Sequence, residues 1–144
     1  MVNMQTILIP VDGSNQALRA VRHAIASIEG GLQANIHVLN VQLPLTTLSE
    51  FPVYDYALVE KAQEKQAEKT LKFATKLLDS AELGYTKHFE IGPVAKTIVD
   101  YAKANKCDSI IMGTRGMGAF GNLVLGSIAN QVVHLAEIPV TLVK

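Results

Sequence analysis

The sequence has no excess of charge of either sign and almost no cysteine. Its 13 lysines and arginines balance 13 aspartates and glutamates, so it lacks the positive field that holds nucleic acid by its phosphates. Cys107 is the single cysteine and cannot form an internal disulfide, which suits a reducing compartment. We therefore expect a cytoplasmic protein without a nucleic-acid partner.

Long hydrophobic runs are also absent. No stretch approaches the roughly 18 apolar residues of a membrane-spanning helix, and residues 1–5 lack the positive charge that opens a signal peptide. We expect a soluble protein that is neither exported by a signal peptide nor bound to a membrane. At 144 residues the chain suits one domain, residues 1–144, whose core needs neither disulfides nor metals.

Short apolar segments alternate with amphipathic segments along the whole chain. Ser14 is expected to cap the first helix, which Gly30 and Gly31 end. Gly84 is expected to stop the second helix, and Pro93 suits the first turn of the third. The expected strands are residues 6–11, 35–41, 85–91, 108–112 and 140–143; the expected helices follow Ser14, span 55–82, follow Pro93 and span 127–136, with a loop at 43–55.

This alternation predicts an α/β fold with a single doubly wound, five-stranded parallel sheet, strand order 3-2-1-4-5 and helices on both faces. Strands one and four then flank the point where the winding direction reverses. Ligands of such sheets bind there, beyond the carboxyl ends of the strands. Because Asp12 follows strand one and Gly113 follows strand four, we expect these two distant segments to form one crevice.

A glycine pattern follows the fourth expected strand. Gly113 and Gly116 are separated from Gly126 and Ser127 by nine residues. Glycine lets backbone N–H groups approach an anion closely, and a helix start adds unpaired donors and about half a positive charge. The pattern therefore predicts a phosphate-binding loop, and a nucleotide is the expected ligand.

Other sites with recognisable motifs are excluded. No Gly-Lys-Ser or Gly-Lys-Thr occurs, so the P-loop lysine is missing. Gly116, Gly118 and Gly121 match a dinucleotide fingerprint, but the sequence after them is too short for the second strand and acidic residue that it requires. The four histidines lack paired metal-ligand spacing, and no serine lies in a Gly-x-Ser-x-Gly context. We expect satisfied histidines and no catalytic residue.

The glycine spacing that ends at Ser127 resembles the nucleotide-binding signature of the universal stress protein family, in its ATP-binding branch. Segment 7–14 is similar to that family's first strand and Asp-bearing turn, and segment 138–143 is similar to its closing strand. The resemblance covers the whole chain. It implies a nucleotide-dependent regulatory protein of the stress response that binds ATP with Mg²⁺ and forms a homodimer through its last strand.

The glycine loop allows two interpretations. In the first, Gly113, Gly116, Gly126 and Ser127 hold phosphates and ribose through backbone N–H groups, and the Ser127 hydroxyl is a further donor. In the second, the segment is a surface loop in which Ser127 only caps the helix. Arg115 either neutralises phosphate charge or is solvated.

The resemblance also implies roles for residues outside the glycines. Asp12 would lie near the ribose or near a phosphate-bound Mg²⁺, which favours such a carboxylate oxygen; the alternative is that Asp12 caps the next helix. The other implied nucleotide contacts are Pro10, Val11 and Val41 beside the adenine, Met112 before the loop, and Ile128 and Ala129 on the phosphate side.

Three function classes follow. The first is a nucleotide-binding module without efficient turnover. The second is a slow ATP-hydrolysing or nucleotidyl-transfer enzyme, since the same architecture hosts such chemistry. The third is a dimeric scaffold that binds nothing, against which the intact glycines argue.

Overall fold

The computed structural model describes residues 3–45, 55–114 and 125–144. Strands and helices alternate along these residues, and every predicted strand is present. Their bounds are β1 (Gln5–Pro10), α1 (Asn15–Glu29), β2 (Ala34–Gln42), α3 (Tyr56–Ser80), β3 (Tyr85–Ile91), α4 (Val94–Ala104), β4 (Ser109–Gly113), α5 (Ser127–Leu135) and β5 (Val140–Val143).

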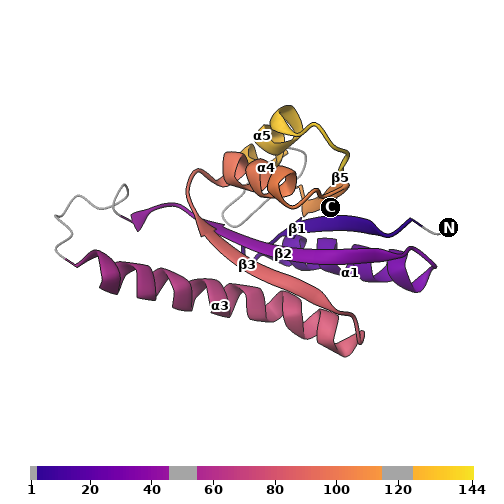
Figure 1. The fold of residues 1–144 in the computed structure, drawn as a ribbon, viewed down its shortest axis with the longest axis horizontal. Coiled ribbons are helices and arrows are strands. Elements are labelled where there is room, and N and C mark those ends of the chain that lie inside the picture. The colour runs from indigo at the N-terminus through magenta and orange to yellow at the C-terminus, as the bar shows by residue number, and fades with distance from the viewer. Residues whose placement is uncertain (1–2, 46–54, 115–124) are drawn as a thin grey trace.

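The strands form one five-stranded sheet in the order β3-β2-β1-β4-β5, and all its neighbours pair in parallel. Figure 1 shows α4 and α5 above the sheet and α1 and α3 below it. The predicted fold class, strand order and placement of helices on both faces are therefore confirmed. The winding direction reverses between β1 and β4, as expected.

The core consists of two apolar layers, one on each face of the sheet. Ile7 and Ile9 of β1 point to the layer that α1 and α3 cover, while Leu8 points to the layer under α4 and α5. All three side chains are buried. Burial on both faces explains why β1 is an unbroken apolar run instead of an alternating one.

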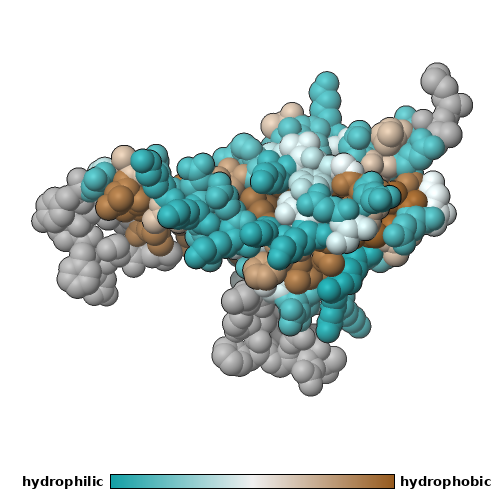
Figure 2. Space-filling view, turned by 90° about the horizontal axis from the view of Figure 1, so that it is seen from below, coloured by the Kyte–Doolittle hydropathy of each residue, from teal (hydrophilic) through white to brown (hydrophobic). Residues whose placement is uncertain are grey.

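The long helix α3 buries one narrow face and exposes the rest. Ala67, Leu71, Ala74 and Leu78 are buried, whereas the charged residues Glu60, Lys61, Glu64, Lys65, Glu68, Lys69 and Lys72 are exposed. Figure 2, which views the molecule from below, shows a largely hydrophilic surface on this side. These charges form a solvated face, as their spacing predicted.

The end of α3 differs from the sequence-based expectation. The helix ends at Ser80, and Glu82 adopts a left-handed conformation with φ 58°. The N–H groups of Glu82 and Leu83 donate to the carbonyl oxygens of Asp79 and Leu78 at 3.0 Å each, a Schellman motif. The prediction that Gly84 stops the helix was wrong. The turn that ends the helix lies at Glu82, two residues earlier, because Leu83 must turn back toward the core.

Other boundaries shift by a residue or two. Pro93 is the N-cap of α4 and precedes its first turn, and Gly113 is the last residue of β4, not the first of a loop. Gly31, with φ 115°, ends α1 as expected. Most of the predicted loop at 43–55 lies outside the described residues.

Candidate functional site

The carboxyl ends of β1 and β4 lie side by side. Leu8 of β1 is in register with Ile110 of β4, so both strands end at the same edge of the sheet. The first turn of α1 packs against this edge: a Cβ added to Gly113 would lie 2.7 Å from the Gln16 Cβ and 2.9 Å from its carbonyl carbon. Gly113 is therefore required for helix packing, whatever it does for a ligand.

The turn after β1 is built by Asp12, Gly13 and Ser14. Gly13 has φ +87°, a conformation that a residue with a Cβ rarely adopts. The Asp12 Oδ1 accepts a hydrogen bond from the Ser14 N–H at 2.9 Å. The Ser14 Oγ accepts one from the Ala17 N–H at 3.1 Å.

This geometry separates the roles of the two polar side chains. Ser14 is the N-cap of α1, as predicted, so the alternative that Asp12 caps this helix was wrong. Asp12 braces the turn that precedes the cap.

The start of α5 lies beside the end of β4. The Gly126 N–H donates to the Thr114 carbonyl oxygen at 2.7 Å, and the Thr114 N–H donates to the Val143 carbonyl oxygen at 3.0 Å. These two bonds join the ends of the glycine segment to each other and to β5. Residues 115–124, including Arg115 and Gly116, lie outside the described residues.

Gly126 is the N-cap of α5 and makes no side-chain capping bond. Ser127 is the first helical residue, so the alternative in which Ser127 is the N-cap was wrong. Ser127, Ile128 and Ala129 occupy the first turn, where backbone N–H groups have no acceptor within the helix. Together with the helix dipole, these donors favour an anion at this end of α5.

The residues predicted beside adenine, and Met112, predicted before the loop, lie at the same edge. Val11 and Met112 are 4% and 6% exposed, so their side chains belong to the core and only their backbone can face a ligand. Pro10 ends β1. Val41 is partly buried and packs against the layer under α4 and α5.

A buried amide network that sequence reasoning missed holds this edge in place. The Val11 N–H donates to the Leu39 carbonyl oxygen at 2.8 Å, and the Asn40 Nδ2 donates to the Val11 carbonyl oxygen at 2.9 Å. The Gln42 Nε2 donates to the Asn40 Oδ1 at 3.0 Å and to the Gln63 carbonyl oxygen at 3.1 Å. The signal was Asn40, a polar residue inside an apolar strand.

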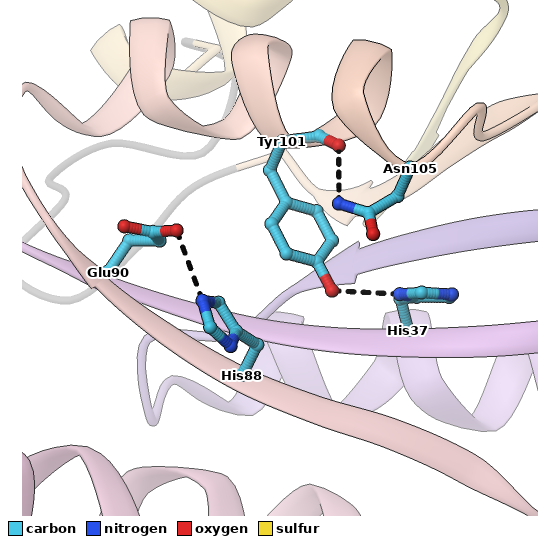
Figure 3. A network of polar contacts seen from close by, with 5 residues as sticks. All are labelled: His37, His88, Glu90, Tyr101 and Asn105. Atoms are coloured by element: carbon cyan, nitrogen blue, oxygen red, sulfur yellow. Dashed lines mark hydrogen bonds and ion pairs between the residues drawn. The ribbon is translucent and has the colours of Figure 1, made fainter.

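Two histidines lie away from this edge, on the α4 side of β2 and β3 (Figure 3). The His37 Nδ1 and the Tyr101 Oη are 2.8 Å apart, and the His88 Nε2 is 3.1 Å from the Glu90 Oε1. The Tyr101 ring stacks on His88 with 5.5 Å between centroids. Burial lowers the pKa of His37. Burial is also the largest of the causes that raise the pKa of Tyr101. Both histidines are satisfied by protein groups.

Two features are absent from the described part of the chain. It contains no cluster of three or more histidine, cysteine or acidic side chains that could hold a metal ion. None of its helices is long and apolar enough to cross a membrane.

Relatives of the chain are found across its whole length. A universal stress protein of Thermus aquaticus is 35% identical over 144 residues, which cover 97% of this chain and 98% of the relative. A universal stress protein of Methanocaldococcus jannaschii is 32% identical over 141 residues, which cover 96% of this chain and 81% of the relative.

Solved structures share the fold. A hypothetical protein studied as a test case of structural genomics matches with a TM-score of 0.82 at 24% identity, over 97% of this chain and 95% of that one. The complex of a universal stress protein from Archaeoglobus fulgidus with dAMP matches with a TM-score of 0.65 at 22% identity, over 100% of both chains.

A model of the universal stress protein family matches residues 3–144 of the sequence. This match, the relatives above 30% identity and the shared fold agree with one another. The chain therefore belongs to the universal stress protein family.

Proposed function

We propose that this protein binds ATP with Mg²⁺ at the edge where β1 and β4 end, and that residues 1–144 act as one nucleotide-dependent regulatory domain of the stress response. The observation that carries the proposal is the start of α5. Its N-cap is a glycine, bonded to Thr114 at the end of β4, and so has no side chain that competes with an anion for the first N–H groups of the helix. This helix start lies where the winding of the sheet reverses, between β1 and β4. The dAMP complex of a family member supports an adenine nucleotide as the ligand.

In this proposal the phosphates lie against the first turn of α5 and the glycine loop. Hydrogen bonds to a charged partner contribute about 1.5–3 kcal/mol each, so three or four backbone donors replace the lysine of a P-loop. The donors are the N–H groups of Ser127, Ile128 and Ala129 and those of the loop that contains Arg115 and Gly116. The Ser127 hydroxyl adds a further donor.

The nucleoside lies toward β1 and β2 in this proposal. Adenine contacts the backbone at Pro10 and Val11 and the Val41 side chain, with Met112 and Gly113 forming the β4 side. The Asn40 network holds the Val11 carbonyl in place. Asp12 faces the ribose or a Mg²⁺ ion carried by the phosphates, where its carboxylate is a suitable oxygen ligand.

The proposal is tested by calorimetric titration of ATP and Mg²⁺ into the wild type and the Gly126→Val variant. A branched side chain at the N-cap keeps a phosphate from the helix N–H groups, and we expect affinity to fall at least about tenfold, or about 1.4 kcal/mol. Gly113 is unsuitable for this test, because a side chain there also displaces Gln16.

Gly84→Val is the matched control. A Cβ at Gly84 meets nothing within 4 Å, so this variant should fold and bind ATP like the wild type. If Gly126→Val keeps its circular dichroism spectrum and binds ATP with undiminished affinity, the phosphate site lies elsewhere.

A further inference from the structure

Strand β2 runs on past the end of β1 (Figure 1). The last pair between these two strands joins Pro10 to Leu39, whereas β2 stays paired with β3 as far as Gln42. Residues 40–42 therefore have a neighbouring strand on one side only. Their open side borders the edge where we place the nucleotide.

The backbone groups of Val41 point to the side that β1 has left. The Leu39 carbonyl oxygen accepts from the Val11 N–H at 2.8 Å, on the β1 side, and the Gln42 carbonyl oxygen accepts from the Gly92 N–H at 2.9 Å, on the β3 side. In a parallel strand the N–H and C=O of one residue point to the same neighbour, and successive residues alternate between the two neighbours. The Val41 N–H and C=O therefore point to the β1 side, like those of Leu39.

A side chain takes the place of the next bond between β1 and β2. In a continuing ladder the Val41 N–H would donate to the Val11 carbonyl oxygen. That oxygen instead accepts a hydrogen bond from the Asn40 Nδ2 at 2.9 Å. Within the described residues no backbone hydrogen bond joins Val41 to Val11, and the pairing stops at Pro10. Asn40 thus ends the ladder and leaves one donor and one acceptor of Val41 without a partner in β1.

A chain of amides fixes the direction in which Asn40 donates. The Asn40 side chain is buried, and its Oδ1 accepts from the Gln42 Nε2 at 3.0 Å. Because the oxygen is held on this side, the Nδ2 faces Val11 on the other. The Gln42 Nε2 also donates to the Gln63 carbonyl oxygen at 3.1 Å, so both of its hydrogens are used. The orientation of the Asn40 amide is therefore set from α3.

A donor beside an acceptor on Val41 fits the edge of a 6-aminopurine. Adenine offers an acceptor at N1 next to the donor of its 6-amino group, whereas hypoxanthine carries an oxygen in place of that amino group. This oxygen would face the Val41 carbonyl oxygen, and an acceptor buried against an acceptor is costly. We propose that Asn40 is a positioning residue for base selectivity, because it keeps the Val41 backbone groups free for the base. This role rests on the proposed nucleotide site.

Hydrogen exchange of the Val41 amide tests the first step without a ligand. In Asn40→Leu the Val11 carbonyl oxygen loses its side-chain partner, and we expect it to accept the Val41 N–H and extend the ladder. NMR should then show exchange of this amide slowed at least about tenfold relative to the wild type. A variant that was only destabilised would exchange faster, not slower.

Calorimetric titration with ATP and with inosine triphosphate, each with Mg²⁺, tests the second step. The wild type should bind ATP at least about tenfold more tightly than inosine triphosphate. Asn40→Leu should bind ATP about tenfold less tightly than the wild type and should keep less than about a threefold preference for it. The two nucleotides carry the same ribose and phosphates, so the ratio of their affinities reports on the base alone.

Two further variants complete the test. Asn35→Leu is the matched control, because Asn35 is an exposed residue of the same strand; Val41 exchange and the affinity ratio should stay as in the wild type. Gln42→Glu is an independent variant if Asn40→Leu does not fold. Its carboxylate accepts from the Asn40 Nδ2 and turns this amide away from Val11, so both measurements should change in the direction expected for Asn40→Leu.

The outcomes separate this role of Asn40 from the proposed function. If the wild type does not bind ATP, the proposed function is refuted, and the role of Asn40 in base selectivity with it. If the wild type binds ATP, the role of Asn40 alone is refuted when folded Asn40→Leu keeps the affinity ratio or the Val41 exchange rate of the wild type. Gln42→Glu decides in the same way if Asn40→Leu does not fold.

Discussion

Single residues at the site edge have two roles each, one structural and one proposed for a ligand. Gly113 allows α1 to pack closely against β4, and Asp12 braces the turn before α1. Val11 and Met112 belong to the core through their side chains. A substitution at any of these residues is therefore expected to change folding as well as the proposed binding, which is why Gly126 and Ser127 are better test positions.

The histidine on β2 makes stability depend on pH. Burial lowers the pKa of His37 below its ordinary value of 6.5, so the unfolded chain binds the proton more readily than the folded protein does. Stability is therefore lost as pH falls through about 6.5. We expect the urea midpoint to fall between about pH 7 and 5, and His37→Gln to flatten this change.

His23→Gln is the control for this titration, because His23 is exposed on α1. It should leave the pH dependence of the wild type intact. The assignment to His37 is rejected if both variants keep the same dependence, or if both lose it equally.

Turnover of the nucleotide also depends on single residues. Phosphoryl transfer needs an aligned nucleophile and charge stabilisation at the terminal phosphate, and Arg115 is the only cationic residue in the predicted loop. We expect phosphate release in excess ATP and Mg²⁺ to remain far below about 1 per second. A rate of that size that disappears in Asp12→Ala, while the variant keeps the circular dichroism spectrum of the wild type, would place this protein among the enzymes.

Elements end where the chain must turn back toward the core. In α1 this turn uses Gly31, with φ 115°, whereas α3 and α4 use Glu82 and Lys106, with φ 58° and 51°. A side chain in this region of backbone conformation costs about 1–2 kcal/mol relative to the right-handed region. Thus α3 and α4 each end on a residue with a side chain, although glycine adopts this backbone conformation at a lower steric cost.

Glu82→Gly should therefore stabilise the protein. Glycine removes the contact between Cβ and carbonyl oxygen at the left-handed position, and we expect the free energy of unfolding to rise by about 0.5–1 kcal/mol after the entropic cost of glycine. Gly31→Ala, the reciprocal change, should lower it by about 1 kcal/mol. Denaturation in urea measures the free energy of unfolding of both variants. A change of the same sign in Glu82→Gly and Gly31→Ala would contradict this account.

At the scale of the whole molecule, β5 forms one edge of the sheet. β5 pairs with β4 on one side and is the last strand of the sheet, and it carries the apolar side chains Val140, Leu142 and Val143. Such an edge exposes backbone groups that can pair with another chain. Antiparallel pairing of two β5 strands about a two-fold axis would cover both edges at once.

We therefore expect a homodimer joined through β5. Light scattering should give about twice the chain mass of 15.6 kDa, and Leu142→Lys should shift the mass toward the monomer. Thr86→Lys, on β3 at the other edge of the sheet, should leave the dimer intact. A wild type that remains monomeric at tens of micromolar, a range in which specific dimers persist, rules out this interface.

The sequence by itself determined the order and type of the elements, the parallel sheet and the place where its winding reverses. These features depend on the local periodicity of apolar residues and on short connections, and both are visible in a single amino-acid sequence. The convergence of Asp12 and Gly113 on one edge follows from that topology alone.

Only the tertiary structure decided how the atoms at this edge share their roles. Three contacts join positions whose separation in sequence carries no periodic signal: the packing of Gln16 on Gly113, the bonding of Asn40 to Val11, and the contact of His37 with Tyr101. Each depends on the distance between packed elements, and that distance is fixed by the side chains of the whole core, acting together.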